Sequence, residues 1–477
     1  MPVLGTWLVT GYEQAVEVLR DARTFTVDDP RFSTAKVVGP SMLSLDGVRH
    51  TRHRAPFTRP FRSEEIHARL DTFTRAEADR LVAAIEPSGA AELRRAVAGP
   101  LAVTVMAEVL GLGRTEPAQV LAWYDGIVAA VQAAAAAAQP VGTAGTAAFS
   151  ELAASLREVI AAPGSASVLS DATGPLTEVE VISNAAVMMF GGIETTEGMI
   201  ANALLHLLSS PAQLELVLAE RGLVSAAIEE SLRLEPAAAV VDRYATRDAW
   251  LGGASVRAGE QVTVSITGAN RDPAVFAEPD LFDVRRPNAG RHLAFAHGPH
   301  FCLGAHLARL EAEVAIGTLL SRLPRLRLDR RYPSAPRGLV FRKPPDLRVR
   351  WTGRPLRVDA PRPGNLDHTA NTGGGAMSEQ DDFAERFHRD RREHAGASQR
   401  LDDDQLARLT EEERVAAGLD AYDPDEVPPA TDTPPQPEDI TQTEEWQEER
   451  AELLREADKG EIRPVDERHP FPPTRYE

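Results

Sequence analysis

The chain has 477 residues, a net charge of −19 and one cysteine, and these features exclude several classes of protein. The acidic excess argues against non-specific nucleic-acid binding, which needs clustered Lys and Arg to replace counterions. The single Cys302 excludes an intrachain disulfide framework and any zinc site built from several thiolates. The sequence has neither an apolar signal core nor a run of about 18 apolar residues, so we expect a cytoplasmic chain without a membrane span.

The acidic charge is concentrated at the C-terminal end of the sequence. Residues 377–477 contain 30 Asp and Glu against 13 Arg and Lys, whereas residues 1–376 are nearly neutral. Between the two parts, several prolines and a run of glycines over 373–375 are typical of a linker. We therefore predict a globular domain over 1–355 and a Pro/Gly linker over 356–376. The remaining 377–477 form an acidic module of unknown role, predicted to be mostly disordered because it has few aromatic residues to bury.

Taken in chain order, the predicted elements of the first domain are mostly helices. Apolar residues recur with helical spacing over 13–19, 64–85, 101–112 and 120–138. A central helix of about thirty residues is predicted between the capping-box sequence 177–180 and Pro211. Two β-rich segments follow, over 254–256 and 261–266 around a turn, and a last helix is predicted over 305–320. The expected fold is mainly α with a small β region.

The middle of the long helix carries the sequence Gly191-Gly192-Ile193-Glu194-Thr195-Thr196. Glycines and β-branched residues weaken a helix, so helix stability does not explain this segment. One interpretation is a close helix crossing at the glycines, with Glu194 on a solvated face. The other is a locally opened helix, where a threonine hydroxyl and an acid hold water beside a cofactor. The segment alone leaves both interpretations open.

Cys302 lies in a Gly- and Pro-containing loop, 295–304, directly before the last predicted helix. The oriented N–H groups at a helix N-terminus lower a thiol's pKa and favour the thiolate as a ligand. A thiolate bound to heme iron donates electron density that promotes O–O cleavage. A single cysteine is more often a small apolar core residue, but the surrounding loop favours the ligand role here.

Four motifs occur in the order found in the cytochrome P450 family, and the chain resembles the bacterial soluble members of that family over about residues 3–351. They are the basic segment 50–54, the long-helix segment 191–196, the Glu230-x-x-Arg233 pair and the loop that contains Cys302. The resemblance implies the cytochrome P450 fold and a heme b monooxygenase that hydroxylates, epoxidises or couples a small hydrophobic or mixed organic substrate. Because the resemblance begins so near the first residue, the family's first helix is expected to be missing.

The resemblance also implies a role for each matching residue. Cys302 would be the axial ligand of the heme iron, and Glu194 and Thr195 would handle protons on the side where dioxygen binds. Heme carries two propionates that need cationic partners, and the matching positions are His50, Arg54, Arg243 and His300.

A structural ion pair is implied for Glu230 and Arg233, joined by Arg286. Removing one partner of such a buried pair costs about 3–5 kcal/mol, so its loss is expected to prevent heme loading.

One position departs from the family pattern. Ala296 stands where a glycine or a small polar residue is usual, and its Cβ restricts φ in a tight turn.

Electrons are expected to come from NAD(P)H through separate redox proteins, a ferredoxin and its reductase, because the sequence carries no flavin or iron–sulfur signature. An alternative function is a heme-binding ligand carrier or sensor without turnover. A further alternative is a non-enzymatic protein in which Cys302 is structural. For the acidic module, fusion of a neighbouring small protein, a missed stop and a mimic of the redox partner all remain open.

Overall fold

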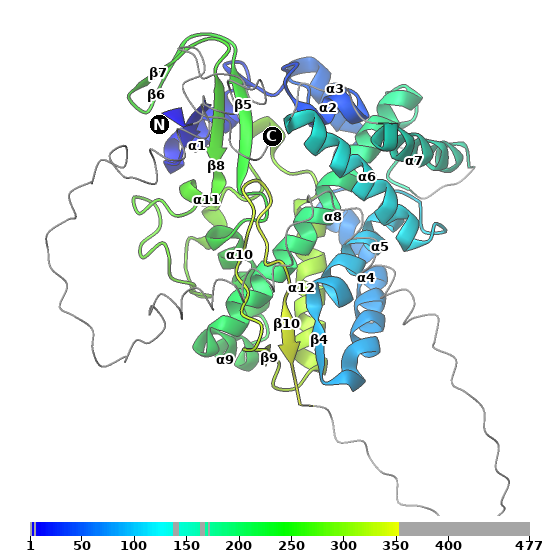
Figure 1. Cartoon of the computed structure of the whole chain (residues 1–477), viewed down its shortest axis with the longest axis vertical. Coiled ribbons are helices and arrows are strands. Elements are labelled where there is room, and N and C mark those ends of the chain that lie inside the picture. The colour runs from blue at the N-terminus through cyan, green and yellow to red at the C-terminus, as the bar shows by residue number, and fades with distance from the viewer. Residues whose placement is uncertain (1, 4–5, 137–142, 163–166, 170–171, 353–477) are drawn as a thin grey trace, which may run out of the picture. The chain divides into compact units, whose positions relative to one another are not determined.

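The computed structural model of the chain describes residues 2–3, 6–136, 143–162, 167–169 and 172–352. Within this part the protein is mostly helical with three small sheets (Figure 1). None of the helices described there is both long and apolar enough to cross a membrane. The expected linker over 356–376 and the acidic module over 377–477 lie outside the described residues.

Six of the described helices begin and end close to the predicted bounds, and no bounds were predicted for the others. The described helices are α1 (Tyr12–Arg20), α2 (Ser33–Val38), α3 (Gly47–Thr58), α4 (Ser63–Ile85), α5 (Gly99–Val109), α6 (Pro117–Ala136), α7 (Thr143–Ala161), α8 (Glu178–Ser209), α9 (Pro211–Ala219), α10 (Leu223–Leu234), α11 (Ile266–Ala269) and α12 (Ala305–Arg322). Short helical turns of other types are η1 (Glu86–Ser88), η2 (Arg94–Ala98), η4 (Ala289–Arg291) and η5 (Gly298–His300). The predicted helical stretches correspond to α1, α4, α5, α6, α8 and α12, and the prediction of a mainly α fold is confirmed.

The long helix α8 begins at a capping box. The Thr177 side chain accepts a hydrogen bond from the Glu180 N–H, and the Glu180 carboxylate accepts one from the Thr177 N–H. The helix ends at Ser209, before Pro211, which begins α9. Since most of its 32 residues are buried, α8 lies at the centre of the helical core.

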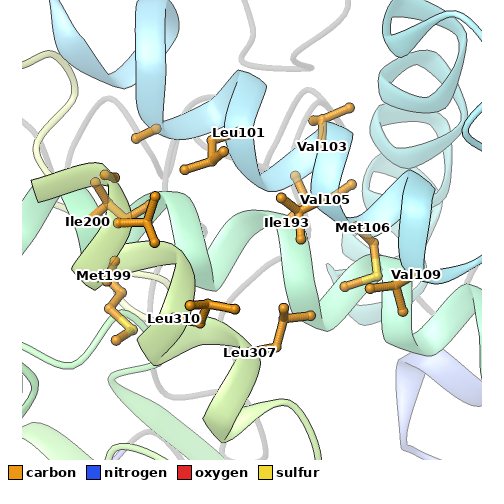
Figure 2. Close-up of a cluster of buried hydrophobic side chains, with 14 of the residues drawn as sticks. Leu101, Val103, Val105, Met106, Val109, Ile193, Met199, Ile200, Leu307 and Leu310 are labelled. Carbon is orange, nitrogen blue, oxygen red and sulfur yellow. The ribbon is translucent and has the colours of Figure 1, made fainter. Parts of the chain in front are cut away.

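Side chains from α5, α8 and α12 form one apolar cluster, which Figure 2 shows with α8 between the other two helices. Its labelled members are Leu101, Val103, Val105, Met106 and Val109 of α5, Ile193, Met199 and Ile200 of α8, and Leu307 and Leu310 of α12. Each fully buried aliphatic side chain of this size contributes about 1.5–3 kcal/mol. This packing fixes the middle of α8 and the N-terminal half of α12 relative to each other.

The strands of the described part are β1 (Pro2–Val3), β2 (Thr6–Val9), β3 (Phe25–Thr26), β4 (Ala90–Glu92), β5 (Val240–Ala245), β6 (Ala249–Leu251), β7 (Ala254–Val256), β8 (Gln261–Ser265), β9 (Arg327–Leu328) and β10 (Arg348–Arg350). The largest sheet has the order β1-β2-β8-β5-β3. The two predicted strands are β7 and β8, but they do not pair across the turn between them: β7 pairs with β6, and β8 pairs with β2 and β5.

Two strand pairings join segments that are far apart in the chain. Strand β2 runs parallel to β8, with Trp7 opposite Val262. Strand β10 pairs with β4, with Val349 opposite Ala91. A second, smaller apolar cluster, which includes Val18 of α1 and Val264 of β8, packs α1 against the largest sheet. These pairings bring the first strands next to β8 and attach the last described strand to the segment between α4 and α5.

Candidate active site

The loop that carries Cys302 is held by backbone geometry. Gly298 has φ of +71°, and a Cβ there would lie 2.6 Å from the carbonyl oxygen of Leu19, so only glycine fits this approach to α1. Ala296 has φ of +57°, an uncommon value for a residue with a Cβ. The Cys302 N–H donates to the Phe295 carbonyl at 2.8 Å. The loop therefore fixes Cys302 three residues before α12.

The Cys302 thiol is subject to opposing influences. Burial raises its pKa, while the Gly304 N–H and the charges of Arg54 and Arg309 act in the opposite direction. A metal cation bound at the sulfur would deprotonate such a thiol outright. The donor chemistry at Cys302 therefore fits an iron ligand.

The four residues expected to bind the propionates come together beside Cys302; we call them the basic cluster. His50 and Arg54 lie on α3, Arg243 on β5 and His300 in the cysteine loop. The imidazole rings of His50 and His300 lie 4.4 Å apart, centroid to centroid. Arg54 Nη2 donates to the carbonyl of Phe301, next to Cys302, at 2.6 Å.

Asp46, which precedes α3, partly neutralises the basic cluster. Its carboxylate accepts hydrogen bonds from His300 Nε2 at 2.8 Å and from Thr26 Oγ1 at 2.6 Å. Its electrostatic attraction also reaches the Arg243 guanidinium. We did not predict Asp46; it directly precedes α3, but its side chain makes no hydrogen bond that caps the helix, so an N-cap signal would not have indicated this role.

The basic cluster keeps polar atoms that lack a partner. His50 Nε2 is buried, and within the described residues it has no hydrogen-bond partner. Arg243 is 5% exposed, and the one hydrogen bond it donates in the described part goes to the Asp242 carbonyl. Because buried polar groups are almost always paired, these atoms fit an anionic group with several acceptor oxygens, such as the two heme propionates.

Burial also affects the charge of the basic cluster. Burial, with the nearby charges of His300 and Arg54, lowers the pKa of His50 to about 4. Burial lowers the pKa of Arg243 to about 10. A carboxylate placed beside these groups would raise both pKa values, since an opposite charge favours the protonated form.

Glu194 and Thr195 lie at mid-length of α8, which continues as an α-helix through them. The Thr195 hydroxyl donates to the Gly191 carbonyl at 2.5 Å. A Cβ on Gly192 would lie 2.1 Å from the Cε atom of Met106, whereas a Cβ on Gly191 would meet no atom within 4 Å. The close crossing of α8 and α5 is present at Gly192, but the helix is not locally opened, and Glu194 does not lie on a solvated face, because its side chain is only 17% exposed.

Sequence reasoning missed the partners of Glu194. Tyr124 Oη of α6 donates to Glu194 Oε2 at 2.6 Å, and Lys343 Nζ lies 2.7 Å from Glu194 Oε1. Lys343 also contacts Glu197, one helical turn further along α8. The spacing of the two glutamates was a detectable signal, since residues three apart share a helix face. No sequence signal indicated Lys343, because it lies 149 residues after Glu194 in the sequence.

Glu230, Arg233 and Arg286 form one buried network. Arg233 binds both Glu230 carboxylate oxygens, at 2.8 and 2.9 Å, and Arg286 Nε lies 2.9 Å from Glu230 Oε1. The two arginines also donate to main-chain carbonyls, among them Leu281 at 3.0 Å from each. This network attaches α10 to the segment 270–286, which precedes the cysteine loop.

Comparison with known proteins agrees with this geometry. The family model described as Cytochrome P450 matches residues 152–345. The cytochrome P450 monooxygenase PikC of Streptomyces venezuelae is 36% identical over 364 residues, which cover 72% of this chain and 85% of PikC. The mycinamicin IV hydroxylase/epoxidase of Micromonospora griseorubida is 33% identical, with coverage of 72% and 89%.

A solved structure supports the same relationship. The ligand-free P450 monooxygenase TamI superposes with a TM-score of 0.63 at 35% sequence identity, covering 72% of this chain and 84% of TamI. None of these comparisons supports a heme-binding carrier or sensor without turnover. The family uses heme iron and takes electrons from NAD(P)H through redox proteins, and its named relatives oxidise small organic molecules. The chain therefore belongs to the cytochrome P450 family and is a heme-dependent monooxygenase.

Proposed function

We propose that Cys302 is the axial ligand of the heme iron and that the basic cluster binds the heme propionates. The observation that carries this proposal is a lone thiol in front of α12, beside basic side chains that include the unpaired His50 Nε2. Arg54 supports both tasks, because its charge acts on the Cys302 thiol and its Nη2 anchors the loop at Phe301. The bound heme supplies the iron centre that activates dioxygen.

We further propose that Thr195 and Glu194 manage protons on the α8 side of the heme. The Thr195 hydroxyl donates its hydrogen bond to the Gly191 carbonyl. The lone pairs of the hydroxyl oxygen therefore remain to accept a hydrogen bond from water. In this proposal, the water held by Thr195 receives protons that a nearby carboxylate relays from solvent. Glu194 is the carboxylate next to Thr195 in the sequence; it accepts a hydrogen bond from Tyr124 at Oε2 and forms an ion pair with Lys343 at Oε1.

The ligand proposal is tested by the reduced carbon monoxide difference spectrum of the holoenzyme and of Cys302→His. We expect the red-shifted thiolate band in the parent protein. In Cys302→His we expect some bound heme, no such band and no substrate oxidation, because a neutral imidazole donates less electron density than a thiolate. Oxidation at the parent rate by Cys302→His would refute the proposal.

We propose a ferredoxin, reduced by its reductase, as the electron donor, and the face around the cysteine loop as its docking site. Arginines contact this loop from two sides: exposed Arg20 of α1 donates to His297 at 2.7 Å, and Arg54 of α3 donates to Phe301. An acidic partner would be steered to such a face.

The docking proposal is tested with Arg20→Glu. We expect slower reduction by an acidic ferredoxin, with the difference shrinking at high salt because exposed charges are screened. The matched control is Arg327→Glu, an exposed arginine on β9, which lies far from α1 in Figure 1. Equal slowing by the two variants would contradict a docking site at this face.

A further inference from the structure

One ammonium group contacts two carboxylates of α8. Lys343 Nζ lies 2.7 Å from Glu194 Oε1 and 2.5 Å from Glu197 Oε2. The side chain of Glu197 is 2% exposed and that of Lys343 is 12% exposed. Charges this far out of water interact strongly, and removing one partner is costly for the others.

Arg94 of η2 also belongs to this network. Its Nε and Nη2 lie 3.0 and 2.9 Å from Glu197 Oε1, and its Nη1 donates to the Pro344 carbonyl at 2.9 Å. Two cations therefore face two carboxylates, and Arg94 binds the residue directly after Lys343. Glu197 keeps a counter-charge from Arg94 even without Lys343.

Glu194 is held from two different elements. Its Oε1 contacts Lys343, while its Oε2 accepts the hydrogen bond from Tyr124 of α6. Rotation of the carboxylate away from this position would break one or both contacts. Without Lys343, the Glu194 carboxylate would lose the ion pair at Oε1 and keep the Tyr124 hydrogen bond at Oε2, so it would be held less firmly in this orientation.

Lys343 ends a turn, 337–343, that packs on the same stretch of α8. The turn is closed by the Arg337 N–H, which donates to the Lys343 carbonyl at 2.9 Å. Its Phe341 ring meets the Phe190 ring of α8 edge to face, with centroids 6.0 Å apart. The Arg342 N–H donates to the Ala237 carbonyl at 2.9 Å, in the apolar segment before β5. The 337–343 turn thus packs against both that apolar segment and α8.

We propose that Lys343 is a positioning residue: its ammonium fixes the Glu194 carboxylate for proton delivery and ties that carboxylate to the 337–343 turn. This inference rests on the role proposed above for Glu194. A lysine suits the task, since a compact ammonium with three donors can serve two separate carboxylates, whereas an arginine fork matches one. The choice is notable in a chain with 49 arginines and three lysines.

The test uses Lys343→Met, which keeps the length of the side chain and removes its charge. With substrate and reduced ferredoxin, we expect the share of electrons lost to hydrogen peroxide to rise several-fold. The carbon monoxide band should not change, because Cys302 is untouched. The matched control is Lys36→Met on α2, an exposed lysine, for which we expect no change in either quantity.

A second measurement does not depend on turnover. Hydrogen exchange of the holoenzyme should be faster over 337–345 in Lys343→Met and unchanged in Lys36→Met. The Arg342 and Lys343 N–H groups, which donate to Ala237 and Arg337 carbonyls, should lose the most protection. If Lys343→Met does not load heme, Lys343→Gln replaces it with the same expectations.

The Glu194→Gln variant separates the two proposals. If Lys343 acts through Glu194, Lys343→Met should add little peroxide in a chain that already carries Glu194→Gln. An undiminished effect there, or no difference between Lys343→Met and Lys36→Met, overturns the inference about Lys343. A Glu194→Gln chain that retains normal coupling overturns instead the proposed role of Glu194, and leaves the assignment of Cys302 intact.

Discussion

The positive φ of Ala296 is a local cost inside the cysteine loop. A left-handed conformation costs a residue with a Cβ roughly 1–2 kcal/mol, while glycine loses about 0.5–1 kcal/mol more entropy on folding. We therefore expect Ala296→Gly to raise the free energy of unfolding by about 0.5–1 kcal/mol. Urea unfolding of the heme-loaded protein measures this change. A lower free energy of unfolding in Ala296→Gly would mean that packing of the Ala296 Cβ stabilises the fold by more than the strain of its positive φ costs.

Glu311 of α12 makes stability depend on pH. Its side chain is buried, its Oε2 has no hydrogen-bond partner among the described residues, and burial raises its pKa well above the ordinary carboxyl value. The folded protein therefore holds this proton up to a higher pH than the unfolded chain does. Stability from this group is complete below the unfolded pKa and falls as pH rises above it.

We expect Glu311→Gln to remove that part of the pH dependence. Its free energy of unfolding should exceed that of the parent protein at about pH 8, and the two should converge at about pH 4, where the unfolded carboxyl is protonated too. Urea unfolding over this pH range measures both curves. Parallel curves would show that Glu311 is ionised in the folded protein.

At the scale of elements, the Glu230 network attaches α10 to the segment before the cysteine loop. Glu230→Gln keeps the shape of the side chain but leaves Arg233 and Arg286 without their shared counter-charge. We expect a loss of about 3–5 kcal/mol in unfolding free energy, together with poor heme retention. Heme content per chain and urea unfolding are the measurements.

A matched control for Glu230→Gln is Glu220→Gln, at the end of α9. Glu220 pairs with Arg285 at 3.5 Å, and both side chains are largely exposed. An exposed pair contributes about 0–1 kcal/mol, so this variant should retain its heme. Equal losses of unfolding free energy and heme in the two variants would show that burial does not determine how much the Glu230 network stabilises the protein.

Local patterns predicted the helices better than they predicted the sheets or the site. The capping box at Thr177 and the apolar spacing along α5 and α8 are short-range signals, and both helices formed where expected. The parallel pairing of β2 with β8 was not visible, because its partners are 255 residues apart. In the site, family motifs identified the residues of the basic cluster, whereas Asp46 and Lys343 depend on contacts that only the folded chain creates.

At the scale of the whole molecule, the described core extends to Trp351. Its side chain is 4% exposed, and its Nε1 donates to the Glu86 carbonyl at 3.1 Å. We expect a chain that ends at Val358 to keep the thiolate band and the thermal midpoint of the full chain. Spectroscopy and thermal unfolding of the two proteins compare them directly.

The control for this truncation is a chain that ends at Asp346. It lacks β10, whose Val349 pairs with Ala91 of β4, and should be far less stable and poor in heme. Loss of the thiolate band already at the Val358 end would move the domain boundary into the acidic part of the sequence.

The pairing of β4 with β10 also limits the order in which the parts of this domain can fold during synthesis. The partner of strand β4 (90–92) follows more than 250 residues later in the sequence, and the separation between β2 and β8 is almost as large. Such contacts close large loops before they stabilise anything, which slows folding. During synthesis the helices α4 and α5 can form early, but β2 cannot pair with β8 until residue 265 has left the ribosome, and β4 cannot pair with β10 until residue 350 has done so. We therefore expect heme capture to follow release of residue 351, and the half-finished chain to depend on chaperones that cover these unpaired strands.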